Sequence, residues 1–493
     1  MKFLENEQRE QIGFSFVMEK TDVITAYGMK EKKYIKPFKM TEKEKLLLEF
    51  ESIQKMVESI NRNKLLHKEL ERILMKFKDI SNSIKRCKKN EILDEVELFE
   101  IKNFALRVEE LLNVMNDIDL DIEEIKLYDL NEIVSLLDPE GKRISTFYIY
   151  DNYSDKLKNI RQQKKEIENK IFKETDEHTI EILKEERLNY VTLEEQEEIE
   201  IKKQLSISIL ESIDKIENDI KIIGRIDILN AKANLAIKYN AKKPKIVDNM
   251  YIKLVDAFNP EVVEILNKKK KKFTPVGIEL RKGTTIITGA NMGGKTVTLK
   301  TIVLNLLLSQ CGFFVFAEEA IFPMLDFIYF ISDDMQSISK GLSTFGAEII
   351  NLKQVVECIK RGNGFIALDE FARGTNPKEG YYIVKSLAEY LNKFDSISLI
   401  STHYDRIAKK GMDHYQVIGL KNLDFEALKH KIDLNKRHSV EIIQEHMNYK
   451  LEKIYDKYEV PKDALNISIL LGLESEIVDI AKKYYYKEEK HEE

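Results

Sequence analysis

The stretch Thr284–Thr296, TTIITGANMGGKT, limits the possible folds of this chain more than any other segment. The β-branched residues at its start predict a buried strand, and the apolar run after it, VTLKTIVLNLLL, is long enough for a helix. The loop between them fits the spacing G-x-x-x-x-G-K-[ST] at Gly289, Gly294, Lys295 and Thr296. In such a loop, backbone N–H groups surround a phosphate, the lysine reaches the β- and γ-phosphates and the threonine hydroxyl binds Mg²⁺. We therefore expect a nucleotide-binding site.

Two carboxylates end a second apolar stretch, GFIALDE, at Asp369 and Glu370. Mg²⁺ on a triphosphate needs a hard oxygen ligand opposite the Thr296 hydroxyl, and Asp369 is placed to supply it, directly or through water. Glu370 can act as general base toward the attacking water. The next predicted strand, SISLIST, leads into His403, which can contact the γ-phosphate or that water, because ligand groups gather at the carboxyl ends of strands in open α/β sheets. A histidine at a strand end is otherwise more often structural.

Length and composition bound the architecture and the partners. A chain of 493 residues exceeds one ordinary hydrophobic core, so two or three domains are expected. The charged fraction of 33% beside 43% hydrophobic residues indicates long helices with solvated faces rather than disorder. The formal net charge of -6 gives no overall basic bias toward nucleic acid, so any DNA contact would have to be local and weak.

Cysteine usage and the absence of long apolar runs predict a cytoplasmic protein without a membrane segment. Cys87, Cys311 and Cys358 are scattered and odd in number, which suits reduced thiols and offers neither a disulfide framework nor metal-ligand spacing. The start, MKFLENEQRE, lacks the apolar region of a secretion signal. The apolar stretch between Thr301 and Phe316 is interrupted by polar residues, so a buried helix followed by a strand is expected there.

Helical periodicity dominates the first half of the chain. Residues 1–150 predict a helical core domain, and residues 151–243 predict an antiparallel coiled-coil lever with a return to the core. The connection between the lever arms is placed at Thr175–Val191, and Thr192 with Glu195 resembles a capping box at the start of the returning helix. The apolar seam comprises Leu157, Ile160, Ile167 and Ile171 on the first arm and Ile201, Leu205, Ile209, Ile213, Ile216, Ile220 and Ile223 on the second.

Residues 244–430 are assigned to a P-loop ATPase domain and residues 431–493 to a C-terminal helical segment, for which the resemblance described below implies a role in dimerisation. The run Lys268–Lys272 ahead of the phosphate loop can contact phosphate, but so short a charged run is more often a solvated loop. The predicted fold class is therefore multidomain. An all-α core with an antiparallel coiled-coil lever is followed by an α/β P-loop domain.

Four motifs, in this order, resemble those of the MutS ATPases, within the larger ABC-type ATPase class. They are ITGANMGGKT (Ile287–Thr296), DDMQSISKGLSTFGAE (Asp333–Glu348), ALDEFARGTNPKEG (Ala367–Gly380) and STHY (Ser401–Tyr404). The resemblance extends upstream through ITAYGMKEKKYIKPF and LLDPEGKRISTFYIYDNYSDKLKNIRQQKKEIENKI, which look like the core and lever helices of the subgroup not devoted to mismatch repair. It covers nearly the whole chain.

The resemblance implies roles for particular residues. Phe273 aligns with an aromatic that stacks on adenine, and Asn291 with Met292 belongs to the NMGGK form of the phosphate loop. Ser343 lies where the family offers a hydroxyl to the γ-phosphate bound by the partner subunit, so that a homodimer or heterodimer completes each site, with the RGTN segment Arg373–Asn376 at the interface. The catalytic set implied is Lys295, Ser343, Glu370 and His403. The ATP-binding set is Phe273, Gly289, Ala290, Asn291, Met292, Gly293, Gly294, Lys295, Thr296 and Thr298, with Mg²⁺ on Thr296 and Asp369.

Departures from the family pattern bear on the biological role. The sequence shows no mismatch-reading domain before the core, no strand-rich clamp between the lever helices and no nuclease-type domain after the ATPase, and these are the parts that contact DNA in the family. The tail VPKDALNISILLGLESEIVDIAKK looks like the family's dimerising helix-turn-helix. The interpretation favoured by these features is an ATP-driven remodeller that resembles the reactivating chaperones of adenosylcobalamin-dependent lysine and ornithine aminomutases. The alternatives are a MutS-type ATPase that binds mismatched or branched DNA, and a structural lever protein with a degenerate ATPase, against which the intact site residues argue.

Overall fold

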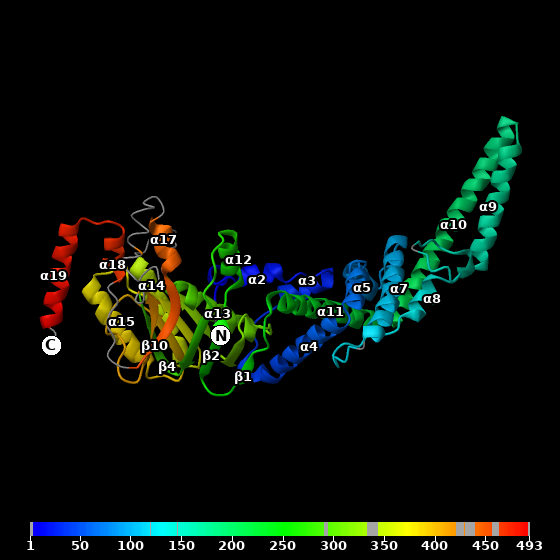
Figure 1. The fold of residues 1–493 in the computed structure, drawn as a ribbon. Helices are drawn as coiled ribbons and strands as arrows, with labels where there is room; N and C mark the ends of the chain where they lie inside the picture. The colour runs from blue at the N-terminus through cyan, green and yellow to red at the C-terminus, as the bar shows by residue number, and fades with distance from the viewer. Residues whose placement is uncertain are drawn as a thin grey trace. The chain divides into compact units, whose positions relative to one another are not determined.

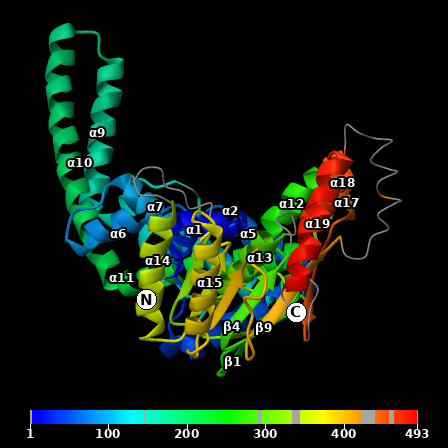
Figure 2. The same ribbon diagram turned by 90° about the vertical axis from the view of Figure 1, so that its left-hand side faces the viewer.

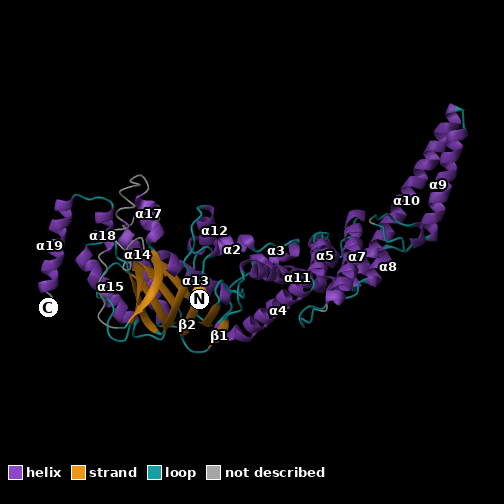
Figure 3. Ribbon diagram, in the orientation of Figure 1, coloured by secondary structure: helices purple, strands orange, loops and turns teal. Residues whose placement is uncertain are grey.

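The computed structural model describes residues 3–118, 120–144, 146–289, 294–332, 344–420, 428, 439–455 and 463–491. The chain divides into two compact units, which we call the sheet unit and the helical unit. The sheet unit comprises Met1–Lys20, Lys36–Phe50 and Leu235–Glu493, and the helical unit comprises Thr21–Ile35 and Glu51–Asn234. Helices predominate, and the strands lie in the C-terminal part of the chain (Figure 3). This distribution is consistent with the multidomain fold predicted from the sequence.

The larger sheet of the sheet unit has the strand order β10-β9-β4-β8-β7-β6. Its strands are β4 (Gly283–Thr288), β6 (Ile328–Ile331), β7 (Phe365–Asp369), β8 (Ile397–Ser401), β9 (Asp413–Gly419) and β10 (Asn448–Ile454). All neighbouring strands run parallel except β10, which is antiparallel to β9. Every residue of β4, β6, β7 and β8 is buried, the pattern of a parallel sheet covered on both faces. The strands predicted around Thr284–Thr288, GFIALDE and SISLIST are therefore confirmed.

Helices cover the two faces of this sheet differently (Figure 1). Ile366 of β7 and Ile400 of β8 belong to a core cluster with α14 (Thr344–Ile359) and α15 (Pro377–Leu391). Because side chains alternate along a strand, Asp369 and Ser401 point to the opposite face, on which α13 (Lys295–Gln310) packs. The buried helix expected after the phosphate loop is confirmed as α13.

Polar side chains of α13 fasten the far half of this helix to neighbouring loops. Asn305 accepts a hydrogen bond from the Phe316 N–H at 2.7 Å and donates to the Phe258 carbonyl at 3.3 Å. Gln310 donates to the carbonyls of Leu325 at 2.6 Å and of Phe38 at 2.9 Å, and its Oε1 accepts from the Leu325 N–H at 3.2 Å. Both amides are buried and hydrogen-bonded through oxygen and nitrogen, so they fix the position of α13 as well as its burial.

A second sheet of the same unit has the strand order β1-β5-β2-β3. Its strands are β1 (Lys245–Val247), β2 (Tyr251–Ala257), β3 (Val276–Arg281) and β5 (Glu319–Pro323). The remaining helices of the unit are α1 (Asn6–Gln11), α2 (Phe14–Lys20), the 3-10 helix η1 (Met40–Glu42), α12 (Pro260–Lys268), α17 (Ser439–His446), α18 (Asp463–Leu470) and α19 (Ser475–His491). Helices α18 and α19 follow each other across a short connection (Figure 1), and the dimerising role of this pair stays a prediction.

Two boundaries differ from those predicted. The segment 431–493 was expected to be helical, yet β10 lies within it and pairs with β9 as an edge strand of the large sheet. The first residues were expected in the helical core, yet Phe3 bridges to Ile328 of β6 and Gln8 donates to the Phe330 carbonyl at 2.5 Å, which places the N-terminus in the sheet unit. Such long-range strand pairing leaves no periodic signal in the N-terminal sequence.

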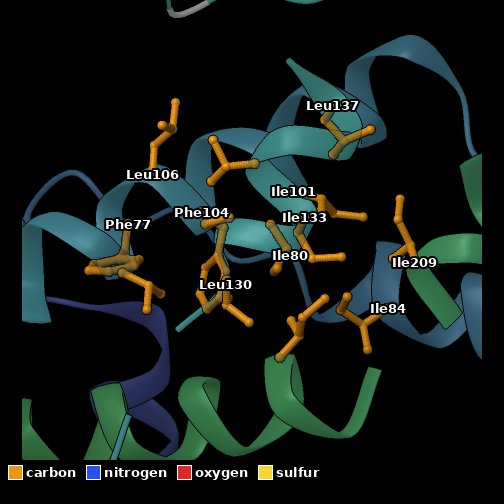
Figure 4. Close-up of a cluster of buried hydrophobic side chains, with 14 of the residues drawn as sticks. Phe77, Ile80, Ile84, Ile101, Phe104, Leu106, Leu130, Ile133, Leu137 and Ile209 are labelled. Atoms are coloured by element: carbon orange, nitrogen blue, oxygen red, sulfur yellow. The ribbon is translucent and has the colours of Figure 1, made fainter. Parts of the chain in front are cut away.

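The helical unit is built around one hydrophobic core (Figure 4). Its elements are α3 (Ala26–Lys33), α5 (Lys64–Leu74), α6 (Ser81–Lys88), α7 (Glu95–Ile118), α8 (Asn131–Leu137), the 3-10 helix η2 (Asp151–Tyr153), α9 (Asp155–Lys173) and α10 (Glu177–Glu211). Helices α4 (Lys43–Arg62) and α11 (Ile213–Tyr239) contribute residues to both units. The labelled side chains in Figure 4, among them Phe77, Phe104 and Ile209, are buried in this core. The expected helical character of this region is confirmed.

The lever arms correspond to α9 and α10, which lie side by side (Figures 1 and 2). Arg161 of α9 bonds to Glu194 at 2.9 Å and to Glu198 at 2.7 Å on α10, and Arg187 of α10 bonds to Glu168 of α9 at 2.8 Å. These ion pairs and the buried Leu157, Ile160, Ile167, Ile201 and Leu205 hold the pair together. The coiled coil itself stays a prediction.

The predicted connection between the arms was wrong. Helix α10 begins at Glu177, with Asp176 as the N-cap whose carboxylate accepts the Thr179 N–H at 2.9 Å, so three residues connect the arms. Thr192 is no cap, because it lies inside α10 and its hydroxyl donates to the Leu188 carbonyl at 3.1 Å. The stretch from Glu177 onward has no Gly or Pro and is rich in good helix formers, which continues the helix through it.

A buried carboxylate on α11 predicts pH-dependent stability of the helical unit. Asp219 is fully buried; Oδ1 accepts the Tyr128 N–H at 2.8 Å, and Oδ2 has no hydrogen-bond partner. Burial raises the pKa of Asp219 to about 6. Because the folded pKa lies above the unfolded one, the folded chain binds the extra proton between these values, and stability from this group is lost as pH rises from 4 through 6.

We expect Asp219→Asn to flatten this dependence. Relative to wild type, the free energy of unfolding of the variant should increase by up to about 3 kcal/mol between pH 4 and pH 8, since one pKa unit corresponds to about 1.4 kcal/mol. Urea unfolding across this pH range measures the effect. Asp214→Asn, an exposed aspartate on the same helix, is the matched control and should follow wild type. A difference between Asp219→Asn and wild type that stays constant with pH would contradict the prediction.

Candidate functional site

The phosphate loop begins at the end of β4 and leads into α13. Gly289 has φ +133° and Gly294 has φ +79°, backbone conformations that favour glycine. A side chain at Gly294 would also approach Tyr449 to 3.1 Å and one at Gly289 would approach Val417 to 3.0 Å. The predicted loop residues Ala290, Asn291, Met292 and Gly293 lie outside the described residues. The backbone conformation and the close neighbours at these two positions therefore both explain why they are glycines.

Lys295 is the first residue of α13 and is 3% exposed. Its Nζ donates to the Gly289 carbonyl at 2.6 Å and lies 3.3 Å from Glu370 Oε1. Burial lowers the pKa of Lys295, while the neighbouring carboxylates of Glu370 and Asp369 oppose that shift. The ammonium group is therefore held at the loop by a carbonyl and a carboxylate, both of which a bound anion can replace.

Asp369, the last residue of β7, lies beside Thr296. Ser401 Oγ donates to Asp369 Oδ1 at 2.5 Å, and the Thr296 side chain also hydrogen-bonds to this carboxylate. Burial raises the pKa of Asp369, although these two hydrogen bonds favour the charged form. The structure thus brings together the hydroxyl and the carboxylate that the sequence assigned to Mg²⁺.

Glu370 occupies the turn after β7 with a left-handed backbone, φ +47°, and Ala372 follows with φ +64°. The Glu370 N–H donates to the Ser401 carbonyl at 3.1 Å. Its carboxylate lies between two cations, Lys295 at 3.3 Å and Arg373 at 3.0 Å. Left-handed residues other than glycine are strained and concentrate at functional sites, which makes this turn a candidate catalytic element.

His403 lies just beyond β8, at the same carboxyl edge of the sheet as Asp369. The imidazole is exposed and contacts the Tyr404 ring, with centroids 4.2 Å apart. The structure therefore joins Lys295, Thr296, Asp369 and Glu370 by direct contacts and leaves His403 at their edge. Ser343 lies outside the described residues.

A pocket of about 690 Å³ adjoins the first turn of α13. It is lined by Gly294, Val297 and Thr298 from the loop and helix, by Val262, Leu266, Phe273, Thr274 and Val276, by Lys269, Lys270, Lys271 and Lys272, and by Glu445, Met447 and Tyr449. Phe273 and Thr298, both predicted to bind ATP, thus border one cavity. The lysine run, for which a solvated loop was favoured, forms part of its wall.

Sequence reasoning missed two contributors to the site. Tyr449 enters the pocket wall from β10, and the alternation of Tyr449 and Leu451 in NYKLEKI was the available signal for that strand. His414 of β9 is buried with Nε2 at 2.8 Å from Thr288 Oγ1, and burial lowers its pKa to about 4. A neutral imidazole therefore supports the last residue of β4, and nothing in the sequence around His414 marks it.

Across the described parts of the chain, no group of three or more His, Cys, Asp or Glu side chains could hold a metal ion by itself. Among the same residues, no helix is both long and apolar enough to span a bilayer. Metal binding at this site would therefore depend on Thr296 and Asp369 together with a ligand that brings its own oxygen atoms.

A glycine loop between a parallel strand and a helix, a buried lysine at the helix start and an acidic pair at the end of a nearby strand define the P-loop class of nucleotide-binding proteins. Residues 285–468 match the family model of MutS domain V. This part of the chain is therefore similar to MutS domain V, and the relatives below bear a MutS name as well.

The relatives bear the name Endonuclease MutS2. The protein from Caldanaerobacter subterraneus is 29% identical over 307 residues, covering 60% of this chain and 35% of the relative. That from Carboxydothermus hydrogenoformans is 30% identical over 309 residues, covering 61% and 36%. That from Caldicellulosiruptor saccharolyticus is 37% identical over 220 residues, covering 43% and 27%. The chain thus spans about a third of the length of the curated relatives it matches. None of these three names supports the aminomutase reactivase that the sequence interpretation favoured, and they fit the DNA alternative better.

Proposed function

We propose that this chain is a MutS-type ATPase that binds ATP with Mg²⁺, hydrolyses it to ADP and phosphate, and acts on DNA. The observation that carries the ATPase part is the contact of Lys295 with Glu370 at the mouth of the phosphate loop, one residue away from the Thr296 and Asp369 pair. Binding, metal and base functions thus converge on the first turn of α13 and the end of β7. The DNA part is supported by the names of the relatives and by the domain V match.

The donor set suits Mg²⁺. The Thr296 hydroxyl and the buried Asp369 carboxylate are hard oxygen ligands already in contact with each other, and Ser401 orients the carboxylate through its 2.5 Å hydrogen bond. When bound, Mg²⁺ neutralises charge that develops on the β- and γ-phosphate oxygens. The protein's part is to hold these two ligands at the start of α13 and the end of β7.

The phosphates of ATP would replace Glu370 as the partner of the Lys295 ammonium group. Lys295 Nζ pairs with Glu370 Oε1 at 3.3 Å, and a triphosphate competes for the same ammonium because it carries more charge. Release from Lys295 leaves Glu370 able to accept a proton from water, while Arg373, 3.0 Å from its other oxygen, still orients the carboxylate. His403 at the sheet edge is proposed to contact the water or the γ-phosphate.

The pocket beside the loop is the proposed site of the adenine and ribose. Phe273 offers an aromatic face for the base, and Thr298 and Val297 of α13 border the same space. Tyr449 adds a second aromatic ring to the wall, next to Gly294. Completion of the site across a homodimer or heterodimer, through Ser343 of the facing subunit, remains part of the proposal.

The DNA part is tested by measuring ATP turnover and DNA binding together. We expect the wild-type chain to hydrolyse ATP and to change its affinity for labelled duplex or branched DNA when ATP is added, in fluorescence anisotropy at roughly 150 mM salt, where nonspecific phosphate contacts are weakened. Lys295→Ala is the control, since a nucleotide-dependent change must vanish in it. Turnover without any ATP-dependent DNA binding would leave the ATPase and exclude DNA as its target.

A further inference from the structure

The turn after β7 holds Glu370 in a backbone conformation that needs external support. Glu370 has φ +47° and Ala372 has φ +64°. For residues other than glycine, each left-handed conformation is unfavourable by roughly 1 to 2 kcal/mol, and it persists where surrounding contacts determine it. The contacts that hold this turn therefore decide where the Glu370 carboxylate lies.

Three sides of the turn are held. Toward β8, the Glu370 N–H donates to the Ser401 carbonyl at 3.1 Å and to its Oγ at 3.2 Å. Toward α15, Gly380 packs so closely that a side chain there would approach the Ala372 carbonyl to 2.9 Å. Toward α14, Glu348 Oε2 accepts the Ala372 N–H at 2.9 Å. The last contact is a side chain of one helix bonded to the backbone of the turn.

Glu348 is well placed to fix this turn. It is 8% exposed, and a buried carboxylate is stable where it accepts hydrogen bonds, as it does from Ala372. Further along α14, Val355 and Ile359 are buried in the core cluster that includes β7, so the helix has a defined position against the strand. The position of α14 is therefore passed through Glu348 to the residue two places after Glu370.

We propose that Glu348 is a positioning residue for Glu370: its hydrogen bond to the Ala372 N–H holds the left-handed turn and so sets the direction of the Glu370 carboxylate. This inference rests on the proposed ATPase function. The position of the Glu370 carboxylate then depends on α14, because a displacement of that helix changes the hydrogen bond between Glu348 and the Ala372 N–H. Lys295 and Thr296 on α13 are not part of that hydrogen bond. Glu348 therefore acts on turnover and leaves nucleotide binding at α13 largely unchanged.

The test is the kinetics of Glu348→Ala and Glu348→Gln. In Glu348→Ala we expect kcat to fall on the order of 10- to 100-fold, as for a small misplacement of a reacting group. The Kd for ATP, measured by calorimetry, should stay within about threefold, because binding at Lys295 and Thr296 is retained. Glu348→Gln keeps an oxygen that can accept the Ala372 N–H and should restore kcat to within about threefold of wild type. Glu357→Ala, an exposed glutamate on the same helix, is the matched control.

Hydrogen–deuterium exchange supplies a readout that does not depend on turnover. The peptide containing Ala372 should exchange faster in Glu348→Ala than in wild type or Glu348→Gln, with equal melting temperatures in all three. An unchanged kcat or unchanged exchange in Glu348→Ala would overturn the assignment. A variant in which kcat, ATP affinity and melting temperature all fall would overturn it too, because the effect would then not be specific to turnover. A wild-type chain without ATP turnover would instead overturn the proposed function, even if the exchange difference appeared.

Discussion

ATP binding is expected to weaken by at least about a hundredfold in Lys295→Ala, which corresponds to about 2.7 kcal/mol. The Lys295 ammonium is 3% exposed, so its hydrogen bonds to phosphate form away from bulk water and are not easily replaced by solvent. Its loss also leaves Glu370 beside the phosphates without the cation that offsets its charge at 3.3 Å. Isothermal titration calorimetry with ATP and Mg²⁺ measures the effect directly.

Lys282→Ala is the matched control for this experiment. Lys282 belongs to the same unit but precedes β4, at the opposite end of that strand from the loop, and its pair with Asp395 is exposed. This variant should bind ATP as wild type does. Calorimetry that shows equal affinities for Lys295→Ala and Lys282→Ala would show that the loop is not the phosphate site.

Glu370→Gln should separate binding from chemistry. We expect kcat to fall by roughly 10²- to 10⁴-fold, because the amide keeps the size of the side chain and cannot accept the proton from water. ATP should bind as tightly as in wild type or up to a few-fold more tightly, since glutamine no longer competes for the Lys295 ammonium. The ATP-bound variant should also accumulate as a closed dimer, which sedimentation velocity with and without ATP would detect.

The control for this variant is Glu379→Gln, an exposed glutamate nine positions later in the chain, in the first turn of α15. It removes the same charge from the same part of the sheet unit without touching Lys295. Wild-type turnover in Glu379→Gln together with loss of turnover in Glu370→Gln assigns the effect to the turn. If Glu370→Gln hydrolyses ATP at the wild-type rate, the general base is another group.

The site could be predicted from the sequence where neighbouring residues encode it. The spacing from Gly289 to Thr296 dictates a strand, a loop and a helix, and the apolar stretch before Asp369 dictates a buried strand, so their meeting at one edge of a parallel sheet follows from general rules. The contact between Lys295 and Glu370 does not follow from such rules. It depends on the left-handed turn after β7, whose φ values come from tertiary contacts with α14, α15 and β8.

The features that the sequence analysis misplaced or missed have other causes. The connection between the lever arms was placed at Thr175–Val191, with Thr192 and Glu195 interpreted as the cap of the returning helix. Asp176 is the actual cap, and the good helix formers after it continue α10 through this stretch. Strand β10 pairs at the sheet edge and is alternately exposed, so its hydrophobic signal is short. The wall that Tyr449 and the lysines form around the pocket arises from two segments far apart in sequence, which single-sequence patterns do not connect.

The hydrogen bonds at the far end of α13 couple this helix to loops that lie away from the phosphate loop. Lys295 is the first residue of α13 and Gln310 its last, and the two lie roughly 22.5 Å apart at 1.5 Å per residue. The side chains of Asn305 and Gln310 both donate and accept hydrogen bonds, and they hold the loops at Phe316 and Leu325. The helix therefore cannot slide past these loops without breaking several hydrogen bonds at once. A displacement of α13 along its axis would therefore also displace the loops that lead into and out of β5.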